Sequence, residues 1–358
     1  MANADLLGKY QPQPSAQYGV QIASWLLLCC VLILAMIVLG GITRLTGSGL
    51  SMVEWGPITG TVPPLNESQW EATFRNYQQY PEYQKVNRSM TLAEFKSIFW
   101  VEYAHRLLGR TIGLVFFVPF IYFLVRRRIG WALAPKLVTM FILGALQGLL
   151  GWFMVKSGLI DEPRVSAYRL TAHLALAAII YGYVLWVALG LLFPKAENDY
   201  QHVKSTRRFS FVVTGVIGIM IISGGFVAGT RAGFAFNTFP LMNGMLIPDG
   251  ILAMKPVWPN FFENIATVQF DHRLIAYSLC ILIPAFCYYV HRTGVVTRTR
   301  VATYVLLITL VIQVSLGIAT LLLIVPAGLS ATHQAGAFAL LTVSLFINHE
   351  LRGRSKKL

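Results

Sequence analysis

Charged side chains are scarce in this sequence. Asp, Glu, Lys and Arg make up 12% of the 358 residues, whereas apolar residues make up 56%. A soluble domain ordinarily carries about twice that charged fraction. The composition therefore excludes an ordinary soluble globular protein and indicates an integral membrane protein.

Cysteine is scarce as well. The four cysteines fall in two apolar runs, as Cys29 with Cys30 and Cys280 with Cys287. None lies in a polar connection, where an oxidising compartment could pair it, so a disulfide framework is excluded and small apolar packing is the expected role. The sequence also lacks C-x-x-C, zinc-like spacing, G-x-S-x-G and a phosphate-cradling loop. These absences count against hydrolases and nucleotide-driven enzymes.

Long apolar runs are abundant instead. About 20 apolar residues cross roughly 30 Å of hydrocarbon, and eight runs have this length. The first is expected to be a retained span, because its leader has no basic region and no small-residue cleavage site closes it. The predicted spans are 22–41, 98–125, 137–155, 171–193, 209–229, 270–290, 301–325 and 331–348.

The net charge of +14 lies in alternate connections between these spans, which indicates membrane topology rather than nucleic-acid binding. The positive-inside rule makes those connections cytoplasmic. The chain is therefore predicted to lie in a bacterial inner membrane with both termini in the cytoplasm and the long connections 42–97 and 230–269 on the outer side. The basic residues are Arg126, Arg127, Arg128 and Lys136; Lys195, Lys204, Arg207 and Arg208; Arg292, Arg298 and Arg300; and Arg352, Arg354, Lys356 and Lys357.

An internal repeat organises the chain. It predicts an all-α membrane protein of two tandem four-helix bundles, residues 1–200 and 201–358, related by a pseudo-twofold axis along the membrane normal. The matching segments are VLGGITRLTGSG with ISGGFVAGTRAG, VEYAHRLLGR with VQFDHRLIAY, LQGLLG with IQVSLG, and LTAHLALA with SATHQAGA.

The repeat aligns His105 with His272 and His173 with His333. Each falls in the first turns of an even-numbered span, so all four lie within roughly 10 Å of the outer hydrocarbon boundary. Facing helices can offer such imidazoles to both sides of a haem iron, and one site per half follows. A packed, hydrogen-bonded histidine remains an alternative for each one, and a dinuclear metal cluster would need more carboxylates. The other histidines, His202, His291 and His349, are predicted to be solvated.

Arginine follows the histidine in both HR motifs, as Arg106 and Arg273. A guanidinium at the outer boundary can bind a haem propionate bidentately, and Arg44 and Arg231 are further candidates. Snorkelling to the water interface is the alternative for all of them. Two glycines, Gly109 and Gly148, are predicted to allow close approach of helices or a ring.

Together, GGITRLTGSGLSMVEWGPITGTVPP, EYAHRLLGRTIG, TAHLALA, DHRLIAY and ATHQAGA resemble the haem A synthase family, in its long-loop bacterial and mitochondrial form. The resemblance spans nearly the whole chain. It implies an oxidoreductase that converts the C8 methyl of haem O to the formyl group of haem A, for cytochrome c oxidase. It also implies contacts with haem O synthase and oxidase assembly factors; a homo-oligomer is left open.

The resemblance further implies a haem b cofactor held by His272 and His333 in the second half, and the substrate haem held by His105 and His173 in the first. One feature departs from the family: some relatives carry cysteine pairs in their outer loops, and this chain has none. A thiol-dependent step is therefore in doubt.

The two halves differ three residues before the first histidine, where Glu102 in the first half aligns with Gln269 in the second. Spacing of three places Glu102 and His105 on one helix face. A carboxylate there suits proton transfer, and a structural acceptor for a neighbouring Arg or Tyr is the alternative. The hypothesis is oxidation of the methyl to an alcohol and then to a hydrate that loses water, with Glu102 handling protons and the second haem relaying electrons.

The first outer connection contains two helix starts, a capping box at Thr91 and a second start at Asn66. This connection could form a lid over the haem site or an aromatic anchor at the membrane interface, and both alternatives remain. Two other protein classes also remain: a dihaem b-type cytochrome between quinone and an outer carrier, which leaves the Glu102/Gln269 difference unexplained, and a transporter, which would need polar groups near the midplane.

Overall fold

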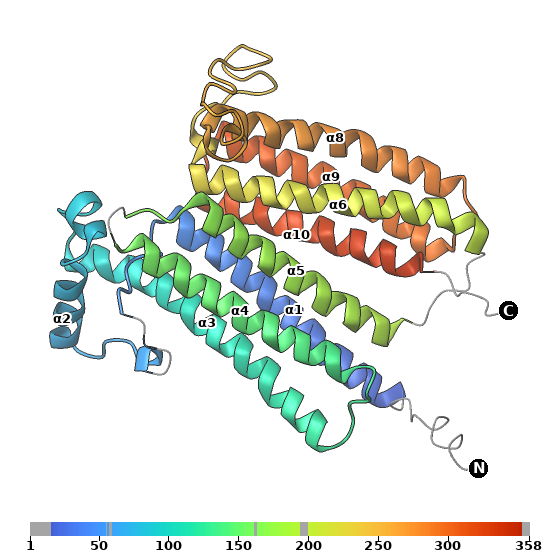
Figure 1. Cartoon of the computed structure of the whole chain (residues 1–358), viewed down its shortest axis with the longest axis horizontal. Coiled ribbons are helices and arrows are strands. Elements are labelled where there is room, and N and C mark those ends of the chain that lie inside the picture. The colour runs from blue at the N-terminus through green and yellow to red at the C-terminus, as the bar shows by residue number, and fades with distance from the viewer. Residues whose placement is uncertain (1–15, 55, 57–58, 161–162, 194–199, 353–358) are drawn as a thin grey trace.

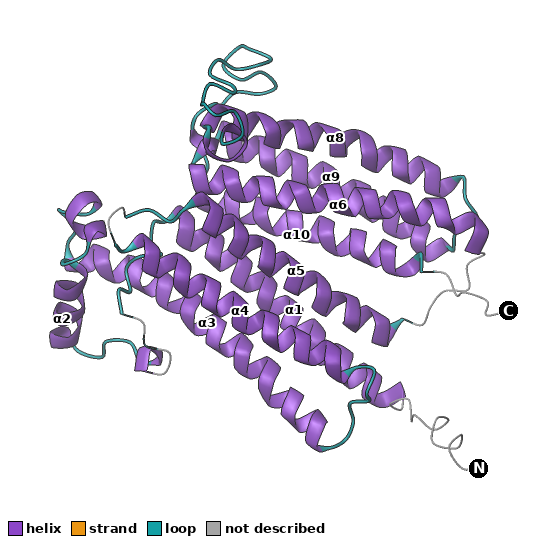
Figure 2. Cartoon of the chain, in the orientation of Figure 1, coloured by secondary structure: helices purple, strands orange, loops and turns teal. Residues whose placement is uncertain are grey.

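The computed structural model describes residues 16–54, 56, 59–160, 163–193 and 200–352. Within these ranges the regular elements are helices, and the only β-type pairing is a single bridge between Met242 and Met245 (Figure 2). Eight of the helices are long and apolar enough to cross a membrane. The predicted all-α, eight-span fold is confirmed.

The spans begin and end close to the predicted positions. The largest difference is at 209–229, where the helix already begins at Tyr200. The helix predicted at 301–325 ends at Leu322, because Ile324 and Val325 adopt φ of 60° and 57°, a left-handed turn into the next helix. The spanning helices are α1 (Ala16–Leu45), α3 (Leu92–Val125), α4 (Ala134–Gly158), α5 (Ala167–Leu192), α6 (Tyr200–Thr230), α8 (Ile265–His291), α9 (Thr297–Leu322) and α10 (Ala327–Glu350).

The spanning helices pack in two groups that lie side by side in Figure 1. In one group α1 packs on α3 and α5, and α4 packs on α3 and α5; in the other α6 packs on α8 and α10, and α9 packs on α8 and α10. Contacts between the groups are α1 with α10, α5 with α6, and α5 with α10. The pseudo-twofold axis and the division into domains 1–200 and 201–358 remain predictions.

The first outer connection is built on α3, whose 34 residues extend about 50 Å at 1.5 Å per residue and so project beyond the bilayer. Both expected helix starts are confirmed: Thr91 forms the capping box with Glu94, and Asn66 caps α2 (Glu67–Tyr77). α2 lies beside the projecting part of α3 (Figure 1). Aromatic rings of the two helices pack on one another. The cluster consists of Trp70, Tyr77, Phe95, Phe99 and Tyr103.

Asn260, which is fully buried, organises the second outer connection. It is the first residue of the one-turn helix α7 (Asn260–Glu263). Its Nδ2 donates to the carbonyls of Met254 and Val257, and its Oδ1 accepts from the amide of Met254. Asn264 then caps α8 by accepting from the amides of Ala266 and Thr267. This fixes the start of the helix that carries His272.

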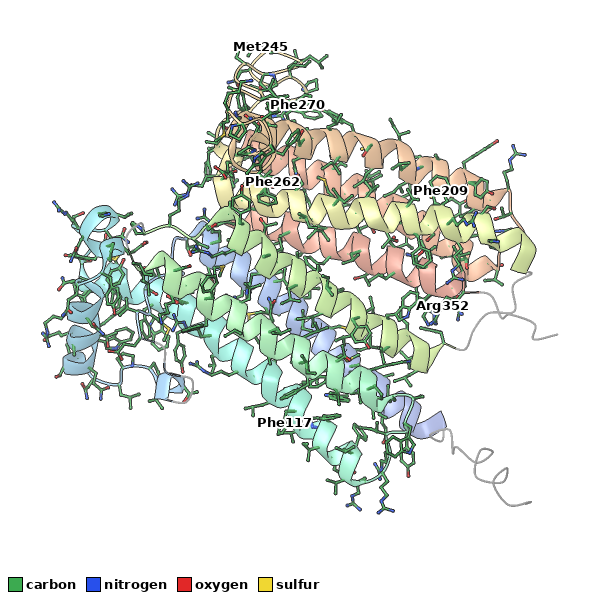
Figure 3. The ribbon with its side chains drawn as sticks, in the orientation of Figure 1. Phe117, Phe209, Met245, Phe262, Phe270 and Arg352 are labelled. Carbon is green, nitrogen blue, oxygen red and sulfur yellow. The ribbon has the colours of Figure 1, made fainter. Side chains whose placement is uncertain are left out.

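The inner end of the bundle corrects one prediction. His349, expected to be solvated, is 2% exposed because its ring packs on Trp186 beside Glu350, itself buried and paired with Arg298. His291 is half-buried, and its Nδ1 lies 2.7 Å from the carbonyl of Cys287. The side chain of His202 lies outside the described residues. Arg352 marks this end in Figure 3, opposite Met245 and Phe262.

Candidate haem-binding sites

The four predicted imidazoles lie on four helices, with His105 on α3, His173 on α5, His272 on α8 and His333 on α10. His105 lies near His173, and His272 lies near His333. The structure therefore brings the imidazoles together in the predicted pairs. Among the described residues, no three His, Cys, Asp or Glu side chains converge into a larger set.

Each imidazole packs against a glycine of a neighbouring helix. A Cβ built at Gly40 would lie 3.2 Å from Nε2 of His105, and one at Gly224 would lie 3.5 Å from Cε1 of His272. The second members of the pairs are closer: 3.0 Å from Gly151 to Cε1 of His173, and 2.8 Å from Gly317 to Cε1 of His333. Glycine is therefore needed where the ring and the neighbouring backbone approach each other.

The close approaches predicted at Gly109 and Gly148 are only partly present. A Cβ at Gly109 would lie 3.3 Å from Cε of Met36, whereas one at Gly148 would meet no atom within 4 Å. The tight position on α4 is Gly151, almost one turn further along the helix and against His173. A single sequence could not distinguish these glycines, because both lie in the same apolar run.

Two of the four imidazoles have a buried ring nitrogen that forms no hydrogen bond with any described residue. Nδ1 of His173 and Nδ1 of His333 are buried without a hydrogen-bond partner in the described part of the chain. Equivalent glutamines, Gln147 and Gln313, donate to the backbone carbonyls of these two histidines at 3.0 and 2.9 Å. An orphaned buried nitrogen costs roughly 1–3 kcal/mol, and coordination to a metal is one way for an imidazole nitrogen to gain a partner. The donor sets fit a haem iron in each half.

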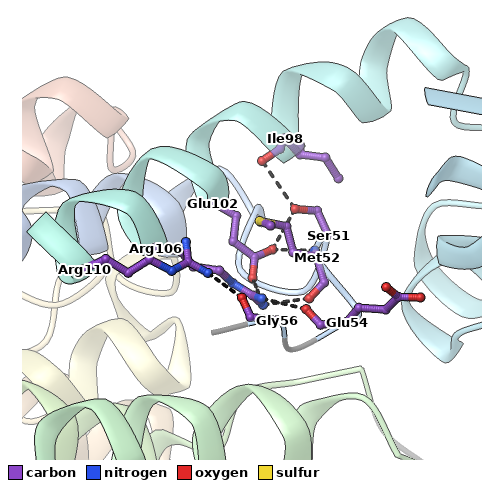
Figure 4. Close-up of polar contacts among 8 residues, drawn as sticks. All are labelled: Ser51, Met52, Glu54, Gly56, Ile98, Glu102, Arg106 and Arg110. Carbon is purple, nitrogen blue, oxygen red and sulfur yellow. Dashed lines mark hydrogen bonds and ion pairs between the residues drawn. The ribbon is translucent and has the colours of Figure 1, made fainter. Parts of the chain in front are cut away.

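Glu102, by contrast, has its oxygens engaged. Oε1 pairs with Arg106 at 2.5 Å, and Oε2 accepts from the hydroxyl of Ser51 at 2.7 Å and from the amide of Met52 at 2.8 Å (Figure 4). Arg106 also donates to the carbonyls of Met52 and Glu54. The pair, one turn apart on α3, thus ties the start of the outer loop to the helix that carries His105. These contacts are the ones expected if Glu102 is a structural hydrogen-bond acceptor for a neighbouring arginine. Contact between Arg106 and a haem propionate stays a prediction.

The second half makes the same kind of attachment with different chemistry. Gln269 donates through Nε2 to the carbonyls of Ala232 and Phe236, and Arg273 donates to the carbonyls of Phe236 and Pro240. The loop therefore presents acceptors to Gln269, whereas the first loop presents donors to Glu102. This reversal gives the Glu/Gln difference a structural reason, because an amide can donate and a carboxylate cannot.

A buried carboxylate that the sequence analysis missed is Glu82, in the single-turn π-helix η2 (Glu82–Val86) of the outer loop. Its side chain is 8% exposed and its Oε2 has no hydrogen-bond partner in the described residues. Burial raises the pKa of Glu82 to about 7, the nearby Glu102 adds to the rise, and Arg231 and Arg44 oppose it. Its segment, a short polar stretch of a long loop, gave no signal of burial.

The raised pKa of Glu82 makes the attachment of the outer loop dependent on pH. The folded carboxyl keeps its proton up to a pH of about 7, whereas a solvated one loses it near 4.5. The contribution of Glu82 to the free energy of unfolding is therefore greatest below pH 4.5 and is lost as the pH rises through 7. The total loss reaches about 3 kcal/mol. We expect amide hydrogen exchange around Glu82 to be faster at pH 8 than at pH 6 after correction for intrinsic rates. Glu82→Gln should abolish this difference, and Glu71→Gln on the exposed face of α2 should retain it; equal exchange in the native protein at both pH values would contradict the assignment.

The eight-span fold and the two imidazole pairs near one end of the bundle define a class: a multi-pass helical membrane protein with paired axial-ligand candidates. Comparison with known proteins identifies the family. Residues 23–345 match the model of the COX15-CtaA family, described as cytochrome oxidase assembly protein, and the chain belongs to this family.

Similar proteins cover nearly the whole chain. It is 54% identical over 345 residues to Heme A synthase of Nitrosospira multiformis, covering 95% of this chain and 97% of that protein. It is 53% identical to Heme A synthase of Nitrosomonas eutropha, covering 94% and 95%. It is also 44% identical to Heme A synthase COX15 of Arabidopsis thaliana, covering 96% of this chain and 77% of that protein.

Proposed function

We propose that this chain is a haem A synthase, which oxidises the C8 methyl of haem O to the formyl group of haem A for cytochrome c oxidase. The observation that carries the proposal is the 54% identity over nearly the full length of a protein named for this activity. The two imidazole pairs support it, because a reaction with one haem as substrate and another as cofactor needs two sites. The dihaem cytochrome is not favoured by these comparisons.

The proposal assigns a role to each pair. His105 and His173 hold the substrate haem, and His272 and His333 hold haem b. When bound, haem b supplies the one-electron redox chemistry that amino-acid side chains lack. The protein orients each ring through its helix and through the glycine packed against it.

Glu102 is proposed to exchange protons at the first site, as the carboxylate nearest in sequence to His105 on the same face of α3. Its contacts with Ser51, Met52 and Arg106 hold the outer loop against the same helix face. Proton exchange and loop attachment therefore depend on one side chain. Arg106 and Arg273 are proposed to place the haem propionates at the outer surface, next to the loop carbonyls that they already bind.

The setting of the reaction is part of the proposal. The chain lies in a bacterial inner membrane, with both termini in the cytoplasm and both haem sites near the outer face. Residues 1–200 form the substrate half and residues 201–358 the cofactor half. Haem O synthase and oxidase assembly factors are the expected partners, because the product of one enzyme is the substrate of the next, and association of two copies of the chain is left open.

Pigment analysis tests the function and the role of Glu102 together. Acid-acetone extraction of the purified protein, followed by chromatography, should yield haem b together with haem O or haem A. Glu102→Gln keeps the size of the side chain but removes the carboxylate, so haem O or its hydroxylated form should accumulate. Glu71→Gln on the exposed face of α2 is the matched control. Haem b alone in the native protein would contradict the function, and a normal haem A yield in Glu102→Gln would remove Glu102 from the reaction.

A further inference from the structure

The two halves present different side chains at one equivalent position beside the first imidazole of each pair. Gly40 of α1 packs against His105, and Gly224 of α6 packs against His272, so the two helices have the same register relative to the rings. The residue before each glycine is Leu39 in the first half and Ser223 in the second. The structure thus aligns an apolar residue with a hydroxyl.

The hydroxyl contacts the imidazole. Oγ of Ser223 lies 3.1 Å from Nδ1 of His272. Leu39 has no polar side-chain atom, and the described residues make no hydrogen bond with the ring of His105. When Nδ1 of His272 carries the proton and donates to Ser223, the lone pair of Nε2 is left free. A ring held in that tautomer is prepared to bind iron through Nε2.

The proposed function gives this difference a purpose. A cofactor haem stays bound through many turnovers, whereas a substrate haem enters before each reaction and leaves after it as product. Hydrogen bonds to the outer nitrogen of a ligating histidine fix its orientation and raise its basicity, and losing one typically costs roughly 10- to 100-fold in metal affinity. The same bond is helpful at a permanent site and unfavourable at a site that must release its haem.

We propose that Ser223 is a positioning residue that holds His272 as a permanent axial ligand, and that Leu39 leaves His105 free to exchange its haem. This inference rests on the assignment of cofactor and substrate to the two halves. One side chain in each half, Ser223 or Leu39, would then determine whether the haem at that site is retained or exchanged.

The rate of haem loss tests the proposal. Purified full-length protein is mixed with excess apomyoglobin, and transfer of haem b is followed by absorbance. Ser223→Ala should release haem b roughly 10- to 100-fold faster and should shift its reduction potential, because a less basic imidazole stabilises the oxidised iron less. Ser223→Thr, which restores the hydroxyl, should recover both values. Ser278→Ala is the matched control, because the hydroxyl of Ser278 bonds only to the carbonyl of Ile275 on its own helix.

The reciprocal change tests the first half. Leu39→Ser should slow the loss of haem O and of haem A from the protein while leaving release of haem b unchanged. An unchanged release rate and potential in Ser223→Ala would overturn the proposal. These measurements follow haem b retention and not turnover, so their failure is distinct from failure of the proposed function, which would appear as the absence of haem O and haem A from the native protein.

Discussion

Replacing His272 or His333 with alanine is expected to yield a folded membrane protein that has lost nearly all of its haem b. Each residue supplies one of the two imidazoles in the second half, and alanine has no atom that can reach an iron. The remaining imidazole would then be the only ligand that this pair offers to the proposed haem b. Absorbance of the purified protein and extracted haem b per chain measure the loss.

The control variants separate ligation from general damage. His291→Ala changes a half-buried histidine at the inner end of α8, which bonds only to its own helix and packs on Tyr304, so haem b should remain at the native level. Imidazole added to His272→Ala should restore part of the absorbance, because free imidazole can occupy the space of the missing ring. An absorption spectrum unchanged in both His272→Ala and His333→Ala would refute the assignment of the second site.

The substrate pair should respond differently. His105→Ala and His173→Ala are expected to retain haem b and to lack haem O and haem A in the extracted pigments. Loss of haem b in these variants, with haem O retained, would reverse the assignment of the two halves.

Adding one methyl group at Gly151 or Gly317 is expected to reduce haem occupancy about tenfold or more. The new Cβ would lie 3.0 Å from His173 in the first case and 2.8 Å from His333 in the second, so the ring or the helix must move. Overpacking of this kind typically costs about 1–3 kcal/mol, and about 1.4 kcal/mol corresponds to a factor of ten in binding. Because each imidazole belongs to one pair, Gly317→Ala should reduce haem b and Gly151→Ala should reduce the substrate haem.

Gly148→Ala provides a matched control on the same helix as Gly151. Its Cβ would meet nothing within 4 Å, and alanine is the better helix former by roughly 1 kcal/mol, so haem content should be unchanged and stability equal or higher. Extracted haem per chain measures all three variants. Equal haem content in Gly148→Ala, Gly151→Ala and Gly317→Ala would show that the glycines do not control access to the rings.

The sequence names the four imidazoles of the candidate site, because the repeat aligns His105 with His272 and His173 with His333. The structure places His105 near His173 and His272 near His333, and their role as haem ligands remains a prediction. Glu102 was placed on the face of His105 by its spacing. A neighbouring arginine was one alternative for its partner, and Arg106 is that arginine. Its loop partners were not predicted, because Ser51 and Met52 lie about 50 residues earlier in a loop whose path depends on packing.

Burial was harder to predict than position. His349 was expected to be solvated because basic residues surround it in the sequence, but Trp186 of α5 covers its ring. Glu82 lies in a polar loop, where a carboxylate is ordinarily exposed, yet its side chain is buried. In both cases the covering group comes from another segment of the chain, and hydropathy averaged along the sequence contains no such information.

The sequence by itself determined the eight spans and the capped helix starts, since these follow from apolar length and local hydrogen bonding, and its internal repeat singled out the four histidines. Only the tertiary structure decided which glycines touch the rings, why Glu102 and Gln269 differ, and that Ser223 contacts His272. The reason is that contacts between helices depend on their rotation and depth, which are set by packing across the whole bundle and not by any one segment.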